Sequence, residues 1–188
     1  IVFISEWVKK KFFEDIFFDS HSKTEIIYHS IDKVNKFNNK KKKQIIFVGK
    51  LNQSKGYDIF CKSLKKVLTN HNDWIAFSFG EEKRFQYYET HKNHKNLGQV
   101  PHKKVLKIFE KSEIAVIPSR WEEPFGRTAL EASSRGCATI ISNKGGLPET
   151  TDHAIKLKKL DVKNLENELL KLINNQNLQK KYQINGFK

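Results

Sequence analysis

Two glutamates lie eight residues apart in a stretch of the chain that the sequence predicts to be helical. Glu123 stands just before Pro124, and Glu131 lies within a predicted helix over residues 125–135. Proline suits the first helical position, Glu123 suits the cap before it, and Gly136 suits the position just past the end. Eight residues at about 1.5 Å of rise each separate the two carboxylates by roughly 12 Å. That separation matches the span from a ribose to a sugar across a diphosphate.

A loop rich in lysine follows a predicted strand over residues 45–49. Lys50 and Lys55 lie in this loop, ahead of a helix predicted to start near Gly56. The N-terminus of a helix attracts phosphate, and two ammonium groups add charge that can hold a diphosphate as it leaves. The loop does not have the Walker spacing, and alone it is better explained as a solvated surface. Its position relative to the other loops is what favours binding.

Glycines mark the ends of two further predicted strands. Gly80 ends a strand and is followed by Glu81 and Glu82, and Gly145 and Gly146 follow another strand. Paired glycines let a backbone approach a ligand closely, although a bare Gly-Gly pair is more often only a turn. Four strand ends thus carry a glycine or a charged loop that points toward one crevice.

The elements that position these loops alternate along the chain. Short apolar runs alternate with amphipathic stretches, a pattern typical of a parallel sheet covered by helices. We therefore predict an α/β fold with a Rossmann-like, doubly wound parallel sheet and a ligand crevice at the carboxyl ends of the strands. The predicted strands are 1–5, 25–28, 45–49, 74–80, 113–118, 137–142 and 154–157, and the predicted helices are 6–18, 57–70, 103–111, 125–135 and 165–174.

A polar stretch without periodicity divides the chain. Residues 33–44 are predicted to be a linker, and residues 45–188 a complete Rossmann-like domain. Residues 1–32 hold too little apolar sequence for a core of their own, so we expect them to be the remnant of a preceding domain. The chain contains no Met and begins with Ile1, which fits a fragment of a longer protein.

Composition bounds the class of protein. The formal charge is +14 over 188 residues, but its lysines are scattered among Asn, Ile and Phe, which favours codon bias over nucleic-acid binding. The surplus charge allows a peripheral contact with anionic lipid. Cys61 and Cys137 show no metal-binding spacing and fit a reducing, cytoplasmic environment. We expect a cytoplasmic protein, at most located at the inner face of a membrane.

Four blocks of sequence together resemble a known family. FVGKLNQSKG (47–56) resembles the "vGRL..KG" loop of GT-B glycosyltransferases, and the stretch over 96–136 resembles their "lG.v…PS..E.fG…lEAmA.G" block. NKGGLPE (143–149) resembles their "GG.pE" turn, and residues 1–32 resemble the last strand, helix and strand of their N-terminal domain. The chain is therefore similar to the C-terminal, donor-binding domain of a retaining glycosyltransferase of group 1, the family 4 type.

The resemblance implies a role for each matching residue. Glu131 would accept hydrogen bonds from the ribose hydroxyls, Glu123 would contact the donor sugar, and Lys50 and Lys55 would hold the diphosphate. In this assignment Glu123, Lys50 and Lys55 are the residues expected to take part in the transfer. Those expected to bind the donor are Gly49, Gly80, Gly98, Val100, Phe125, Gly126, Arg127, Glu131, Gly145 and Gly146.

The resemblance also implies the reaction. A hexosyl group would pass from a UDP- or GDP-linked sugar to a glycan or a lipid-linked acceptor, with retention and without a metal or another cofactor. Surface polysaccharide or lipopolysaccharide synthesis is the expected setting. The acceptor site would lie in an N-terminal domain of the same protein that this chain lacks, so the chain alone should be a weak catalyst. Lys50 departs from the family's arginine, which replaces a bidentate fork by a point charge.

Other interpretations remain open at this point. Two glutamates on a helix are commonly no more than solvent-facing residues. A phosphorylase or epimerase of the same architecture is a second possibility, but the lysine motif for pyridoxal phosphate is not seen and epimerases lack the pattern of Glu123 and Glu131. From another class, a non-catalytic sugar-nucleotide-binding module or a basic membrane-surface module would fit the charge.

Overall fold

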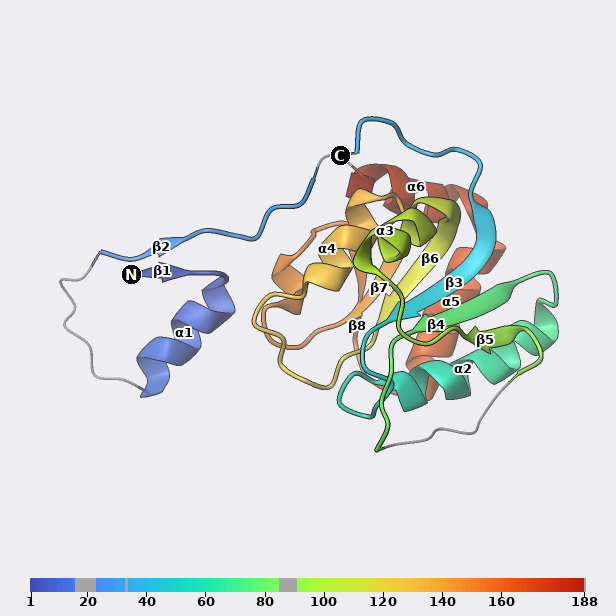
Figure 1. The fold of residues 1–188 in the computed structure, drawn as a ribbon, viewed down its shortest axis with the longest axis horizontal. Helices are drawn as coiled ribbons and strands as arrows, with labels where there is room; N and C mark the ends of the chain where they lie inside the picture. Colours follow the sequence, from blue (N-terminus) through green and yellow to red (C-terminus); the bar gives the residue numbers. More distant parts are fainter. Residues whose placement is uncertain (16–22, 33, 85–90, 188) are drawn as a thin grey trace.

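A parallel six-stranded sheet forms the centre of the protein (Figure 1). The computed structural model describes residues 1–15, 23–32, 34–84 and 91–187. The strand order is β5-β4-β3-β6-β7-β8, and every neighbouring pair is parallel. Within this sheet the chain therefore starts in the middle at β3, runs outward through β4 and β5, and returns to run outward through β6, β7 and β8 on the other side. This confirms the predicted doubly wound sheet.

The strands of the sheet are short and largely buried. Their bounds are β3 Lys42–Val48, β4 Ile75–Phe79, β5 His94–Asn96, β6 Ser112–Ile117, β7 Ala138–Ser142 and β8 Ala154–Leu157. Side chains on β3 alternate between the two faces, with Ile45 and Phe47 in one core and Ile46 in the other. A sheet buried on both faces explains why its strands read as continuous apolar runs rather than as alternating patterns.

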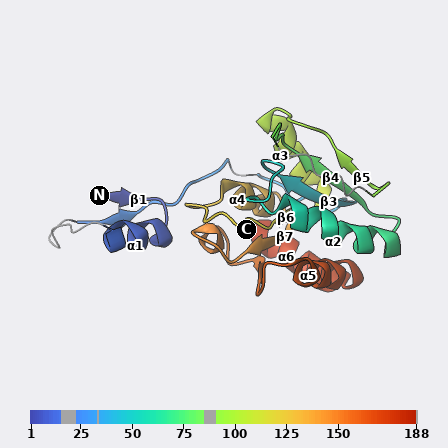
Figure 2. The same cartoon turned by 90° about the horizontal axis from the view of Figure 1, so that it is seen from below.

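Helices cover both faces of the sheet (Figure 2). Helices α2 (Tyr57–Asn70) and α5 (Val162–Asn174) pack on the face of Ile45 and Phe47, while α3 (His102–Lys111) and α4 (Arg127–Ser134) pack on the other. The last helix, α6 (Gln176–Phe187), reaches the start of β6, where Gln183 donates to the carbonyl of Glu113 at 3.1 Å. Among the described residues, no helix is long and apolar enough to cross a membrane.

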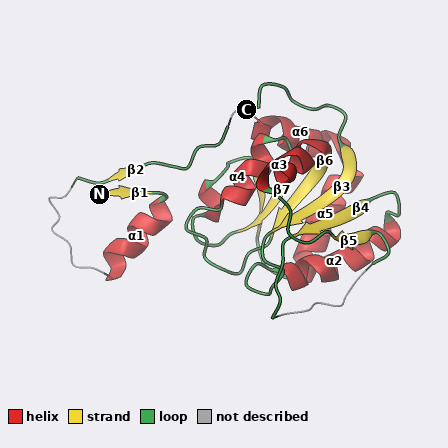
Figure 3. Ribbon diagram, in the orientation of Figure 1, coloured by secondary structure: helices red, strands yellow, loops and turns green. Residues whose placement is uncertain are grey.

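The N-terminal elements lie apart from the main sheet, as the secondary-structure view shows (Figure 3). Strands β1 (Val2–Phe3) and β2 (Glu25–Ile26) pair in parallel, and helix α1 (Glu6–Asp15) follows β1. Residues 16–18 of the predicted helix fall outside the described residues. We call residues 1–32 the N-terminal segment; the proposal that it belongs to another domain remains a prediction.

The structure corrects several predicted boundaries. The strand β5 and the separate helix α6 were not predicted, and β3 begins at Lys42, inside the predicted linker over 33–44. Polar residues fill β5, and lysines begin β3 at an exposed end, so neither stretch has an apolar pattern. Helix α4 begins at Arg127 rather than beside Pro124, because Gly126 with φ 98° is its N-cap. Glu123 is therefore not a helix cap, and the helical rise does not measure its separation from Glu131.

Candidate donor-binding site

Three strand ends meet closely at the carboxyl edge of the sheet. The amide of Gly49, after β3, donates to the carbonyl of Phe79 at 3.0 Å, and the amide of Gly80, after β4, donates to the carbonyl of Gly98 at 2.9 Å. Gly80 has φ 139°, and a Cβ placed there would lie 1.9 Å from the carbonyl oxygen of Gly49. Only glycine allows the first two loops to leave the sheet side by side.

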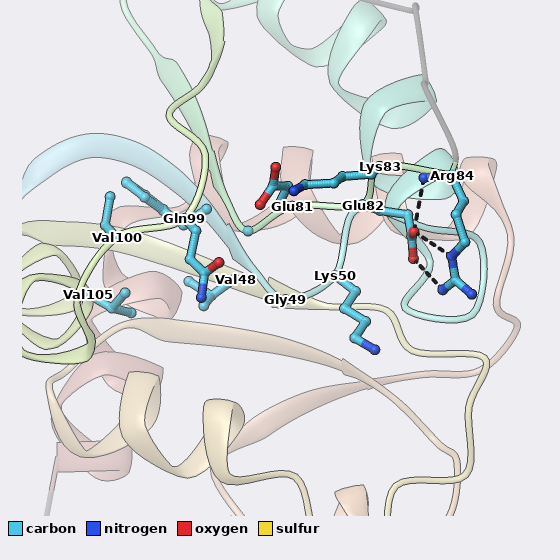
Figure 4. A pocket seen from close by; sticks show the side chains of 12 residues that line it. Val48, Gly49, Lys50, Glu81, Glu82, Lys83, Arg84, Gln99, Val100 and Val105 are labelled. Atoms are coloured by element: carbon cyan, nitrogen blue, oxygen red, sulfur yellow. Dashed lines mark hydrogen bonds and ion pairs between the residues drawn. The ribbon is translucent and has the colours of Figure 1, made fainter.

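A cleft of about 590 Å³ opens above these strand ends (Figure 4). Four predicted residues line it: Gly49, Lys50, Gly80 and Val100. In Figure 4 the charged pair of Glu82 and Arg84 lies on one side of the cleft, and Val100 and Val105 lie on the other. We call this space the first cleft; it combines an apolar wall with a charged wall.

The negative charge of Glu82 is balanced by a neighbouring arginine. Arg84 donates to both of its carboxylate oxygens, at 2.9 and 3.0 Å, and Asn52 donates to it at 3.2 Å. These hydrogen bonds, chiefly those from Arg84, lower the pKa of Glu82 to about 2. Because Arg84 balances this carboxylate, Glu82 does not oppose an anionic ligand as an unpaired charge would.

A second cleft of about 350 Å³ adjoins the first, and both are lined by Val48 and Gly49. We call it the second cleft. It lies at the carboxyl ends of the neighbouring strands β3 and β6, from which the chain runs to opposite halves of the sheet. Open α/β sheets usually bind ligands at this place. Its lining includes the predicted residues Gly49, Lys55, Glu123, Phe125, Gly126 and Arg127.

Lys55 and Glu123 meet across the second cleft. The Lys55 ammonium donates to Oε1 of Glu123 at 2.5 Å, and the Ser119 hydroxyl donates to the same oxygen at 3.0 Å. The two loops are also joined through their backbones, since the amides of Arg120 and Trp121 donate to the carbonyl of Ser54. The structure thus brings together two predicted residues that lie 68 positions apart in the sequence.

Glu131 lies on α4 with its side chain mostly buried, and the residue as a whole is 7% exposed. His102 at the start of α3 approaches it, with Nε2 2.9 Å from Oε1, and Arg127 lies 3.7 Å away. His102 therefore ties this carboxylate to the adjoining helix α3, and Arg127 approaches it from within α4. Glu131 does not line either cleft in the structure described.

The paired glycines Gly145 and Gly146 pack against the backbone of the loop that carries Glu123. A Cβ on Gly145, which has φ 59°, would lie 2.4 Å from the carbonyl oxygen of Glu123. The amide of Gly146 donates to that same carbonyl at 2.7 Å. Gly145, Gly146 and Gly98 are absent from the linings of the two described clefts, so the paired glycines act on the site through the loop that they carry.

Sequence reasoning missed several side chains in and around this site. Ser119 fixes Glu123, Gln99 lines the first cleft, and His102 holds Glu131. Ser119 falls inside the "PS..E" block, so its position beside Glu123 was visible in the motif. His102 gave no signal, because a histidine at a helix start reveals nothing about the helix that packs against it.

The family described as Glycosyl transferases group 1 matches residues 30–188 of the chain. A relative from Methanocaldococcus jannaschii, the uncharacterized glycosyltransferase MJ1607, is 33% identical over 119 residues, covering 60% of this chain and 30% of its own length. An uncharacterized 42.6 kDa protein in the cps region of Klebsiella pneumoniae is 31% identical over 149 residues, covering 78% of this chain and 39% of its own length. The chain thus spans about a third of the length of these relatives.

Among solved structures, Anabaena HepE in complex with UDP and glucose has the same fold. The TM-score is 0.79 at 16% identity, and the superposition covers 99% of this chain and 56% of the HepE chain.

Proposed function

The chain belongs to the glycosyl transferases group 1 family, and from this membership and the geometry of the clefts we propose that it holds the nucleotide-sugar donor of a glycosyltransferase. The observation that carries the proposal is the junction of two clefts at Gly49, with a lysine bordering each. The nucleoside of the donor occupies the first cleft. The diphosphate crosses Gly49 between Lys50 and Lys55, and the sugar reaches Glu123 in the second cleft.

The contacts of Glu123 suit an acceptor of hydrogen bonds better than a base. Lys55 and Ser119 both donate to one carboxylate oxygen, which leaves the other for sugar hydroxyls. A transfer with retention that uses no protein nucleophile fits this arrangement. When a nucleotide enters, Lys55 exchanges part of its contact with Glu123 for the diphosphate, and its charge stabilises the leaving group.

In this proposal the nucleoside end of the donor is bound by Glu131 and by the backbone near Gly98 and Val100. Glu131 leaves His102 and turns its carboxylate to the two ribose hydroxyls, a pairing that both of its oxygens can satisfy. The complex of Anabaena HepE with UDP supports a UDP-linked donor, and a GDP-linked donor remains an alternative.

The acceptor side of the reaction belongs to the longer protein. We propose a hexosyl transfer to a glycan or a lipid-linked acceptor in surface polysaccharide or lipopolysaccharide synthesis, at the cytoplasmic side of a membrane. The relative in the cps region of Klebsiella pneumoniae supports this setting. The chain alone should transfer sugar weakly, because an acceptor-binding domain contributes the other wall of the site.

Calorimetry with UDP and GDP tests the donor assignment. Glu131→Ala should lower nucleotide affinity by about 1.5–3 kcal/mol through the loss of charge-assisted hydrogen bonds. Glu131→Gln keeps the shape of the side chain and should lose a similar amount, while Glu168→Gln on α5 should change nothing. If the folded wild-type chain binds neither nucleotide, the proposed function is wrong; unchanged affinity in both Glu131 variants would refute the role of that residue.

A further inference from the structure

The carboxylate of Glu149 caps a helix that is far away in the sequence. Glu149 follows the paired glycines in the 3₁₀ helix Leu147–Glu149. The amides of Glu6 and Trp7, the first two residues of α1, donate to its two oxygens at 2.7 and 2.9 Å. A helix leaves its first amides without partners and concentrates partial positive charge there, so a two-oxygen carboxylate is a well-matched cap.

Two further contacts join the N-terminal segment to the loop of Glu123, which we call the donor loop (residues 122–126). The Ser5 hydroxyl donates to the carbonyl of Pro124 at 2.6 Å and accepts from the amide of Val8 at 3.0 Å. The rings of Tyr28 and His29 both stack on Phe125, with centroids 5.6 Å away. Ile4 and His29 also line the second cleft, so this segment forms part of its wall.

The donor loop is thus held from two sides by one connected set of contacts. From below, Gly146 bonds the carbonyl of Glu123, and a Cβ on Gly126 would meet Leu147 at 2.4 Å. Leu147 begins the short 3₁₀ helix that ends at Glu149, and the carboxylate of Glu149 accepts the hydrogen bonds from α1. A shift of α1 therefore moves the donor loop directly through Ser5 and indirectly through Glu149.

We propose that Glu149 is a positioning residue that couples the N-terminal segment to the donor loop and so sets the place of Glu123. The inference rests on the proposed function, because it assigns the sugar to Glu123. Loss of the cap releases α1 and loosens the loop at the sugar end of the donor. The nucleoside end, which depends on β3, β4 and Glu131, keeps its geometry. Glu149 therefore tightens the binding of the sugar rather than that of the nucleotide.

Binding of nucleotides with and without the sugar separates these two ends. The experiment compares UDP with UDP-glucose, and in parallel GDP with GDP-mannose, on the wild-type chain and on Glu149→Gln by calorimetry. Glutamine replaces an acceptor oxygen by an amide donor that faces a helix N–H, so one cap bond and the charge are lost. We expect the affinity for the sugar nucleotide to fall on the order of tenfold, and that for the nucleoside diphosphate less than about threefold.

Matched variants separate positioning from general damage. Glu168→Gln removes an α5 carboxylate that pairs only with exposed Lys171 in the contacts described, and it should change neither affinity. Glu149→Asp keeps the charge and should recover part of the lost affinity. Ser5→Ala breaks the link to Pro124 and should show the same selective loss, which keeps the test available if Glu149→Gln folds poorly. Hydrogen exchange should accelerate at the amides of Glu6 and Trp7 in Glu149→Gln.

Three results would overturn the inference. Equal losses for the sugar nucleotide and the nucleoside diphosphate would indicate only structural damage, and unchanged affinities would show that the cap does not act on the site. Absence of binding by the wild-type chain would remove the proposed function and the inference with it. The wild-type titration distinguishes the last case from the first two.

Discussion

Lys55 and Glu123 lie on different loops, and their side chains meet at the second cleft. The lysine side chain is 30% exposed and the glutamate 16%, so the pair is shielded but reachable by a ligand. A pair of this kind keeps an ammonium group beside the site before any phosphate arrives. Ser119, four residues before Glu123 in the same loop, donates to the same oxygen, so the carboxylate is held from both loops.

Replacing Lys55 tests the part assigned to this pair. Lys55→Met keeps most of the aliphatic stem but removes the charge, so UDP affinity should fall by about 1.5–3 kcal/mol in a calorimetric titration. Lys62→Met on the exposed side of α2 is the matched control and should have no effect. UDP affinity that is equal in Lys55→Met and wild type would show that the diphosphate does not pass this residue.

Residue types and spacing predicted several of the residues that line the clefts at the edge of the sheet, among them Lys50, Lys55 and Glu123, but not which of them touch. Lys55 and Glu123 were both expected to contact the donor, and their ion pair was not foreseen. A motif records residues within one loop, whereas a contact between loops depends on how the strands beneath are paired. The partnership of Glu149 with α1 was hidden for the same reason.

At the level of the secondary-structure elements, the ends of the strands build the floor of the site. Gly80 packs its α-carbon against the backbone of Gly49, which fixes the spacing of the loops after β3 and β4. This spacing sets the floor of the first cleft. The ends of β3 and β4 therefore contribute a rigid backbone surface, and the loops that follow these strands supply the charges.

Gly80→Ala should be strongly destabilising because it combines steric overlap with an unfavourable φ of 139°. We expect a loss of about 2–4 kcal/mol in the free energy of unfolding, measured in urea. Gly98→Ala is the control, since its φ is also positive but a Cβ there meets nothing within 4 Å. It should cost only about 1 kcal/mol. Equal losses in the two variants would contradict the close packing of β3 and β4.

The unpredicted strand β5 carries a histidine whose protonation should affect stability. His94 is within 2.6 Å of the Ser78 hydroxyl, and burial, with a smaller effect of His91, lowers its pKa to about 4 from an ordinary 6.5. Between those values the unfolded chain takes up a proton that the folded chain does not. The contribution of His94 to stability is therefore present above pH 6.5 and lost as the pH falls toward 4.

Urea unfolding across this pH range checks the histidine. The free energy of unfolding should decrease from pH 6.5 to pH 4 in the wild-type chain. The decrease should be smaller in His94→Asn, which cannot titrate there. The same slope in both proteins would show that His94 is not held neutral by the fold.

At the scale of the whole molecule, the fold was largely predictable and its edges were not. Apolar runs identified β3, β4, β6, β7 and β8, because strands buried on both faces must be apolar along their length. The sequence HKN in β5 has no such run, and within the described part of the chain this strand pairs only with β4, at the edge of the sheet. Helix α4 starts later than expected because Gly126, and not Pro124, provides its first turn with a cap.

The sheet order also explains how a set of loops scattered through the sequence becomes one site. β3 and β6 are neighbours although α2, β4, β5 and α3 separate them in the chain, so the Lys55 loop and the Glu123 loop meet where the two halves diverge. The first cleft lies beside this point on β3 and β4. We therefore propose that the donor lies along the carboxyl edge of the sheet, across both clefts.

Amide chemical shifts measured during a titration with UDP test that location most directly. We expect the amide signals of Gly49, Gly80, Gly98 and Gly126 to shift together and saturate at one dissociation constant, while those of α5 and α6 stay in place. Absence of shifts at these glycines, or shifts confined to α5 and α6, would contradict it.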